Sequence, residues 1–181
     1  MAAQLVQVAV VKELLPKMKK AIFYIALLFS MSVFSQESLN DLLHRLNDEV
    51  IPYISVQELA MPKTQVVLLD SREKIEFEVS HIKNALFVGY NDFDLNIVRD
   101  KIQDKHQKIV VYCSLGVRSE DIAERLKKAG YQNVFNLYGG IFEWKNQGFE
   151  VVDENGRETE SVHVFSKQWG KWLTNGILIY D

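Results

Sequence analysis

Apolar and polar residues follow two different periodicities along the chain. Four short runs are predominantly apolar and end at polar residues or turns, as buried strands of a sheet do. They are residues 66–69, 85–88, 109–112 and 134–137. In the segments before, between and after these runs, apolar residues recur every three or four positions, which predicts helices that bury one face. These helices are expected over residues 39–50, 56–60, 73–79, 95–102, 119–129 and 139–147.

Residues at the ends of these segments support the helix assignments. Ser55 precedes one helix and Glu58 follows three residues later, the pattern of a capping box. Ser119 is expected to cap the longest helix, and Gly130 to end it. Strands that alternate with helices predict an α/β fold, with an open parallel sheet and helices on both faces. Neither an internal repeat nor a linker indicates a second domain.

The composition narrows the range of functions. The chain has 181 residues, 48% apolar and 25% charged, which is enough for one domain with a buried core. Its net charge of −3 gives no electrostatic basis for binding nucleic acid. Cys113 is the single cysteine, so the chain can form neither an internal disulfide nor a thiolate-rich metal site. The histidines lack ligand spacing, and we expect no metal, no cofactor and a monomer.

Residues 1–35 carry an excess of positive charge. Three lysines at positions 17, 19 and 20 precede an apolar run over residues 21–34. This run is too short for a bilayer core, which needs about 20 residues, but it fits the apolar region of a secretory signal. We expect an upstream extension and signal peptide cleaved after Ser35, with export to a bacterial periplasm. A membrane anchor over residues 21–34 is the alternative, and Met18 is an alternative start to Met1.

The candidate chemistry lies where the strand over residues 109–112 ends. Cys113 is followed by Ser114, Leu115, Gly116, Val117, Arg118 and Ser119, and then by the longest predicted helix. A ligand site is expected at this end of a parallel sheet. Backbone amides of the loop, the positive end of the helix and the charge of Arg118 all favour a thiolate. We therefore expect the pKa of Cys113 to lie below the free value of about 8.5. The alternative is a buried cysteine that acts only as a small apolar residue.

Three segments together resemble the rhodanese-like sulfurtransferase family. The loop from Cys113 to Ser119 is similar to its active-site loop. Residues 68–73, 76–77 and 81–85 are similar to its first signature, and residues 137–141 with Trp144 and Gly148 to its closing signature. The resemblance covers residues 52–150, between an N-terminal helix over 36–51 and a C-terminal extension over 151–181.

The resemblance implies a five-stranded parallel sheet and a specific activity. Cys113 would take a sulfane sulfur from a small-molecule donor, such as thiosulfate or a persulfide, and pass it to a thiol, to cyanide or to a protein acceptor. Ser114 stands where thiosulfate-using members often carry a second cation, which disfavours thiosulfate as the natural donor. Ser80 and Asn84 stand where the family often has glycine. A sulfur-relay or protein-binding module without turnover is the alternative function.

A cysteine-dependent phosphatase is a rival with the same kind of loop. Its signature has five residues between Cys and Arg, whereas residues 114–117 make four here, a tighter loop suited to a single sulfur atom. Tyr112 replaces the usual preceding histidine, and no motif places an Asp as general acid. The sequence therefore favours sulfur transfer.

For several other polar and aromatic residues the sequence allows two roles. Asp70 and Arg72 are expected to form a buried ion pair, although Arg72 facing an anionic substrate is an alternative. The resemblance suggests that His81 supports the fold through a hydrogen bond, rather than shuttling protons. Trp169 and Trp172 either pack on the domain or contribute to a partner or acceptor surface.

Overall fold

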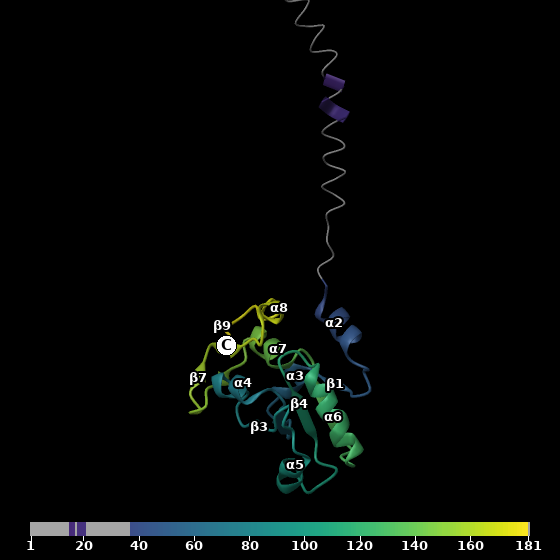
Figure 1. Ribbon diagram of the computed structural model, residues 1–181, viewed down its shortest axis with the longest axis vertical. Coiled ribbons are helices and arrows are strands. Elements are labelled where there is room, and N and C mark those ends of the chain that lie inside the picture. Colours follow the sequence, from purple (N-terminus) through teal and green to yellow (C-terminus); the bar gives the residue numbers. More distant parts are fainter. Residues whose placement is uncertain (1–14, 17, 21–36, 181) are drawn as a thin grey trace, which may run out of the picture. The chain divides into compact units, whose positions relative to one another are not determined.

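A computed structural model describes residues 15, 16, 18–20 and 37–180 of the protein (Figure 1). Residues from Ser38 onward form one compact unit. The expected signal region over residues 21–34 and its cleavage site after Ser35 lie outside the described residues. In the part of the chain that is described, none of the helices has the length and apolar character needed to cross a membrane.

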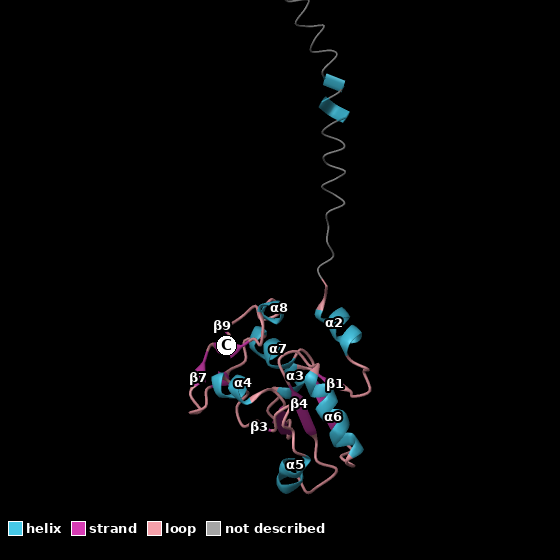
Figure 2. Ribbon diagram, viewed as in Figure 1, coloured by secondary structure: helices cyan, strands magenta, loops and turns pink. Residues whose placement is uncertain are grey.

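The centre of the compact unit is a five-stranded parallel sheet. Its strands lie in the order β1-β5-β4-β2-β3, and every neighbouring pair is parallel. The bounds are β1 Tyr53–Ile54, β2 Val67–Asp70, β3 Leu86–Phe87, β4 Ile109–Tyr112 and β5 Val134–Leu137. Both faces carry helices, as Figure 2 shows in cyan around the magenta strands. The expected α/β fold with an open parallel sheet is thereby confirmed.

The two faces of the sheet bury separate apolar cores. Alternate residues of β4 point to opposite sides, so that Ile109 and Val111 join one core while Val110 and Tyr112 join the other. Helices α5 (Leu95–Lys101) and α6 (Arg118–Lys128) cover the first face. The second face is covered by α2 (Leu39–Leu46), α3 (Val56–Leu59), α7 (Gly140–Asn146) and the C-terminal segment. Every residue of β4 is fully buried, which explains its continuous apolar sequence.

Two helix ends depart from the sequence prediction in ways that bear on the site, while the other helix bounds agree with it to within one residue. The first helix ends at Leu46, four residues earlier than expected, and the Asn47 side chain bonds instead to the Gly116 carbonyl and the Tyr53 hydroxyl. Helix α6 begins at Arg118, and the residue at its N-cap position is Val117, whose side chain forms no capping bond. The prediction that Ser119 caps this helix is therefore wrong. Ser55 does cap α3, by accepting a bond from the Glu58 amide at 3.1 Å.

The C-terminal extension is built from short elements that the periodicity did not predict. Strands β6 (Val151–Val152) and β7 (Glu158–Thr159) form an antiparallel hairpin, and β8 (Ser161–His163) pairs in parallel with β9 (Ile177–Ile179). In the sequence, helix α8 (Lys167–Gly170) follows β8 and precedes β9. Strand β8 packs against helix α4 (Lys74–Val79), which brings the extension to the carboxyl end of β2. The extension therefore folds back towards the same end of the sheet as Cys113.

Candidate active site

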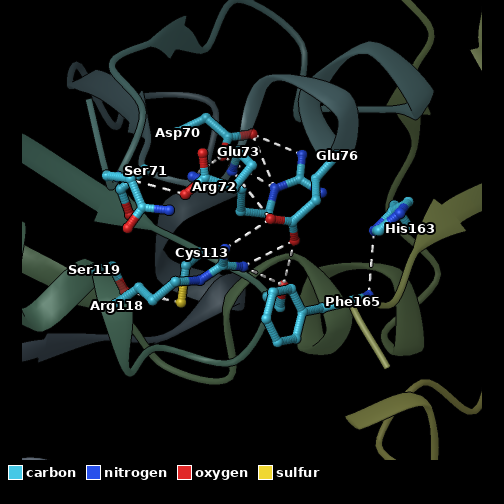
Figure 3. Close-up of polar contacts among 12 residues, drawn as sticks. Asp70, Ser71, Arg72, Glu73, Glu76, Cys113, Arg118, Ser119, His163 and Phe165 are labelled. Carbon is cyan, nitrogen blue, oxygen red and sulfur yellow. Dashed lines mark hydrogen bonds and ion pairs between the residues drawn. The ribbon is translucent and has the colours of Figure 1, made fainter. Parts of the chain in front are cut away.

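Cys113 lies at the carboxyl end of β4, within a loop that folds around its sulfur (Figure 3). Its side chain is 2% exposed, and the Gly116 amide donates a hydrogen bond to Sγ at 3.1 Å. Gly116 has a φ of 112°, a conformation that a residue with a Cβ would oppose. The loop can therefore point this amide at the sulfur because a glycine stands there.

Two asparagines and Ser119 hold the loop from the side of β5. The Asn136 amide donates to the Gly116 carbonyl at 2.7 Å, and Asn47 donates to the same oxygen at 2.9 Å. Ser119 Oγ donates to Asn136 Oδ1 at 2.7 Å and lies 3.5 Å from Cys113 Sγ. Sequence reasoning missed both asparagines, since neither Asn47 at the end of α2 nor Asn136 within β5 belongs to a recognisable motif. The Ser119 side chain thus belongs to the wall of the sulfur site.

Arg118 faces the sulfur and is fixed by a buried carboxylate. Glu76, on α4, is 1% exposed and accepts two bonds from the guanidinium, at 2.7 and 2.8 Å. Ser114 Oγ joins this network by donating to Glu76 at 3.1 Å and accepting from Arg118 at 3.0 Å. Burial opposes the charge of Glu76, but Arg118 and Arg72 outweigh it and lower the pKa of the carboxyl. Glu76 was not predicted as a site residue, although it lies in the first signature.

The surroundings of Cys113 favour its ionised form. Burial by itself raises the pKa of the thiol. The charge of Arg118 and the hydrogen bonds from Ser119 and Gly116 act in the opposite direction, and the pKa of Cys113 is lowered on balance. This arrangement favours the thiolate, which is the nucleophilic form of the side chain.

Two backbone amides at the start of α7 bind carbonyl groups of the loop. The Ile141 amide donates to the Cys113 carbonyl at 2.9 Å, and the Phe142 amide donates to the Ser114 carbonyl at 3.1 Å. At Gly140 an added Cβ would collide with the Cys113 carbonyl oxygen. Only glycine allows this close approach, which explains why Gly140 stands at the start of the helix.

A cavity of about 200 Å³ opens beside the sulfur. Five of its lining residues come from the loop and the start of α6: Cys113, Ser114, Leu115, Val117 and Arg118. The other two, Phe165 and Trp169, come from the C-terminal segment. Phe165 lies with its ring centroid 5.2 Å from the Arg118 guanidinium carbon, in a left-handed conformation with a φ of 61°. Such a backbone costs about 1–3 kcal/mol and is found preferentially at functional sites.

The three supporting residues expected from the sequence lie outside this cavity. Arg72 is fully buried and bonds to Asp70 at 2.7 and 3.0 Å and to the Ser80 carbonyl at 2.6 Å. Arg72 therefore forms a buried ion pair with Asp70 at the end of β2 and is not accessible to a substrate. His81 stacks on Phe77 with ring centroids 3.9 Å apart, and its backbone bridges to Val152. Trp169 and Trp172 are both half-buried, and of these two residues only Trp169 lines the cavity.

A family model for the rhodanese-like domain matches residues 55–147. The chain belongs to the rhodanese-like domain family. Within the described residues, no group of three or more His, Cys, Asp or Glu side chains is placed to hold a metal ion.

Solved structures share this fold. A rhodanese-related protein from Thermoplasma volcanium is 27% identical, with a TM-score of 0.50 over 57% of this chain and 99% of the other. A thiosulfate sulfurtransferase from Pseudomonas aeruginosa is 21% identical, with a TM-score of 0.52 over 68% of this chain and 23% of the other. At that identity the second likeness concerns the fold alone.

Curated relatives are longer proteins. The chain is 32% identical to a tRNA uridine(34) hydroxylase of Erwinia tasmaniensis over 64% of this chain and 34% of the relative. It is 36% identical to the protein of that name in Yersinia enterocolitica, over 63% of this chain and 33% of the relative. The rhodanese-like chain thus spans about a third of the length of these relatives.

Proposed function

We propose that this protein is a sulfurtransferase that carries a sulfane sulfur on Cys113. The observation that carries the proposal is the thiolate environment of Cys113 beside an open cavity, with the Gly116 amide on its sulfur and Arg118 nearby. The loop residues Ser114 to Ser119 hold and stabilise the anionic sulfur. No metal or organic cofactor enters the proposed chemistry.

The proposed reaction has two balanced steps. The Cys113 thiolate attacks the outer sulfur of a donor R–S–SH, the S–S bond of the donor breaks, and R–S⁻ leaves while Cys113 becomes a persulfide. An acceptor thiolate then attacks the outer sulfur of that persulfide and regenerates the Cys113 thiolate. With thiosulfate the leaving group is sulfite. Neither step needs an oxidant or a reductant.

Mass spectrometry of the intact chain tests the proposal. After incubation with thiosulfate or an organic persulfide and removal of excess donor, Cys113 should gain about 32 Da, one sulfur atom. Cyanide should then remove the added mass, and Cys113→Ser should gain none. A wild-type protein that stays unmodified by every donor would rule out sulfur transfer.

A sulfur-relay module without rapid turnover is the second candidate. It is favoured by the pairing of Arg118 with Glu76 and by the absence of a cation at Ser114, because both weaken attraction for dianionic thiosulfate. A relay would form the persulfide but show no turnover of thiosulfate with cyanide. Steady-state turnover abolished by Cys113→Ser identifies the enzyme instead.

The names of the curated relatives suggest a different substrate, tRNA. We do not extend it to this chain, because the chain spans a third of those proteins and its net charge of −3 offers no attraction for phosphate. We also propose that residues 1–35 direct export. A mature N-terminus at Gln36, found by mass spectrometry of the protein from its native host, supports export; one at Met1 or Met18 excludes it.

A further inference from the structure

The cavity beside Cys113 has two unlike walls. One wall is the polar loop with Arg118, and the other is aromatic, formed by Phe165 and Trp169 from the C-terminal segment. The aromatic wall lies outside residues 55–147, the range matched by the rhodanese-like family. It is therefore an addition of the extension to a site whose sulfur chemistry resides in the loop.

The aromatic wall is firmly anchored although its surface is open. Val162 and Val164 are fully buried in the core behind it, and the Phe165 amide donates to His163 Nδ1 at 3.2 Å. Phe165 itself is 54% exposed. An exposed aromatic ring in a strained backbone, held in place by buried neighbours, is expected where a ligand covers the ring.

The charge of the cavity does not favour a dianion. Arg118 is the one cation among its lining residues, and Glu76 binds it through both carboxylate oxygens. The neighbouring pair of Arg72 and Asp70 is also balanced. Once Cys113 is a thiolate, these groups sum to a negative charge, so that a neutral or singly charged sulfur compound enters more readily than thiosulfate.

The volume of the cavity sets the size of the group it can hold. A cavity of about 150 Å³ lined by apolar side chains binds benzene. The cavity here has about 200 Å³ and is lined by Leu115, Val117, Phe165 and Trp169 besides its polar residues. A phenyl-sized substituent fits beside the sulfur, whereas a large cofactor does not.

We propose that Phe165 and Trp169 form an apolar subsite for the organic substituent of a low-molecular-weight thiol or persulfide, positioned so that its sulfur meets Cys113. The inference rests on the proposed sulfur transfer and names its substrate class. The substituent R is the same whether it arrives on the donor R–S–SH or on the acceptor R–S⁻. The C-terminal segment would thus determine specificity.

Three donors that carry an outer sulfane sulfur on a sulfonyl group provide the test. Methanethiosulfonate and benzenethiosulfonate are both singly charged and differ only in their organic substituent, whereas thiosulfate is a dianion without one. Each gives the outer sulfur to the Cys113 thiolate, and sulfite, methanesulfinate or benzenesulfinate leaves with the electron pair of the broken S–S bond. In wild type, benzenethiosulfonate should load Cys113 about tenfold faster than methanethiosulfonate, as expected for burial of a phenyl group.

Phe165→Ala and Trp169→Ala should each lower the benzenethiosulfonate rate about tenfold and change the other two rates less than about twofold. Trp172→Ala is the matched control, since Trp172 lies in the same segment and does not line the cavity. It should keep the wild-type order of donors. An equal loss with all three donors would instead mean that the aromatic wall only positions Arg118.

A second arm separates donor from acceptor. Cys113 is first loaded with thiosulfate, and discharge by phenylmethanethiol is compared with discharge by cyanide, which has no substituent. A phenyl preference in either arm that depends on Phe165 supports the subsite and identifies which substrate it serves. Equal behaviour of all substituents in both arms overturns it.

A binding measurement tests the subsite independently of sulfur transfer. It remains informative if no donor forms a persulfide, which is the result that would rule out the proposed function. Saturation-transfer NMR of benzenesulfinate with Cys113→Ser should show binding that the added Phe165→Ala substitution removes. Absence of binding to Cys113→Ser, or binding unaffected by Phe165→Ala, would overturn the subsite. Thermal melting of each variant confirms that the comparison is between folded proteins.

Discussion

Two arginine–carboxylate pairs lie near the carboxyl end of the sheet, and they differ in what they face. Arg72 and Asp70 are both completely buried at the end of β2, and one guanidinium nitrogen of Arg72 has no hydrogen-bond partner. Arg118 pairs with the equally buried Glu76, but its side chain is 18% exposed and lines the cavity. The same type of ion pair therefore has two roles. The Arg72–Asp70 pair, here called the inner pair, stabilises the fold, whereas the Arg118–Glu76 pair, the outer pair, influences the ionisation of Cys113.

Removing one partner of the inner pair should have the largest effect. Arg72→Ala leaves Asp70 buried without its cation and should lower the free energy of unfolding by about 3–5 kcal/mol. Urea denaturation measures this loss. The rate of persulfide formation by the molecules that remain folded should change little, because Arg72 does not reach the cavity.

The control for this change is Lys128→Ala, which removes an exposed ion pair with Glu124. It should cost less than about 1 kcal/mol. If Arg72→Ala were no more destabilising than Lys128→Ala, the inner pair would have no special structural role.

Breaking the outer pair should act on chemistry. Arg118→Ala removes the charge beside the thiolate and should slow persulfide formation about a hundredfold, the usual effect of losing one anion-stabilising group. The pKa of Cys113 should rise, which the ultraviolet absorbance of the thiolate reports. Arg118→Lys should retain part of the pKa depression. An unchanged pKa in Arg118→Ala would contradict the electrostatic role assigned to this arginine.

Neutralising Glu76 tests whether this carboxylate offsets the charge of Arg118. Glu76→Gln keeps the shape of the side chain but frees the charge of Arg118, so that the rate with dianionic thiosulfate should rise about tenfold relative to a neutral persulfide donor. Glu78→Gln on the same helix is the control, since Glu78 pairs with Lys74 in solvent. A donor preference that both variants leave unchanged would show that Glu76 does not offset Arg118.

The pH dependence should give the smallest effect. Because the folded pKa of Cys113 is lowered, the thiolate contributes stability that is complete above the unfolded pKa of about 8.5 and is lost as pH falls through the folded pKa. Wild type should therefore gain more unfolding free energy than Cys113→Ser as pH rises through this window. Urea denaturation at several pH values measures the difference, and parallel profiles would contradict it.

The sequence predicted the parts of the fold whose residues are buried on both sides. The run at 109–112 matches β4 residue for residue, because a strand buried on both faces in the middle of a parallel sheet is apolar throughout. The bounds of β5 were also predicted, although this strand carries the buried Asn136, whose side chain binds the loop. Strand β1 was missed, since two residues at the sheet edge make no periodic pattern. The strands of the extension were missed for the same reason, as each has two or three residues.

The candidate site was predicted only along the loop itself. Cys113, Gly116 and Arg118 lie close together in the sequence and belong to one motif. Glu76, Asn136 and Phe165 reach the site from three other elements, and local pattern carries no information about such long-range contacts. Ser119 was assigned to the wrong partner because a serine before a helical pattern suggests a cap, whereas a buried asparagine in β5 offers its hydroxyl another partner.

The contact between α7 and the Cys113 loop bears on local unfolding. Amides in the first turn of a helix ordinarily exchange quickly with solvent, because no carbonyl of the helix accepts from them. Here the Ile141 and Phe142 amides are bonded to the loop carbonyls, and both residues are fully buried. Their hydrogen exchange should therefore report on opening of the loop, and α7 and the loop should open as one cooperative unit.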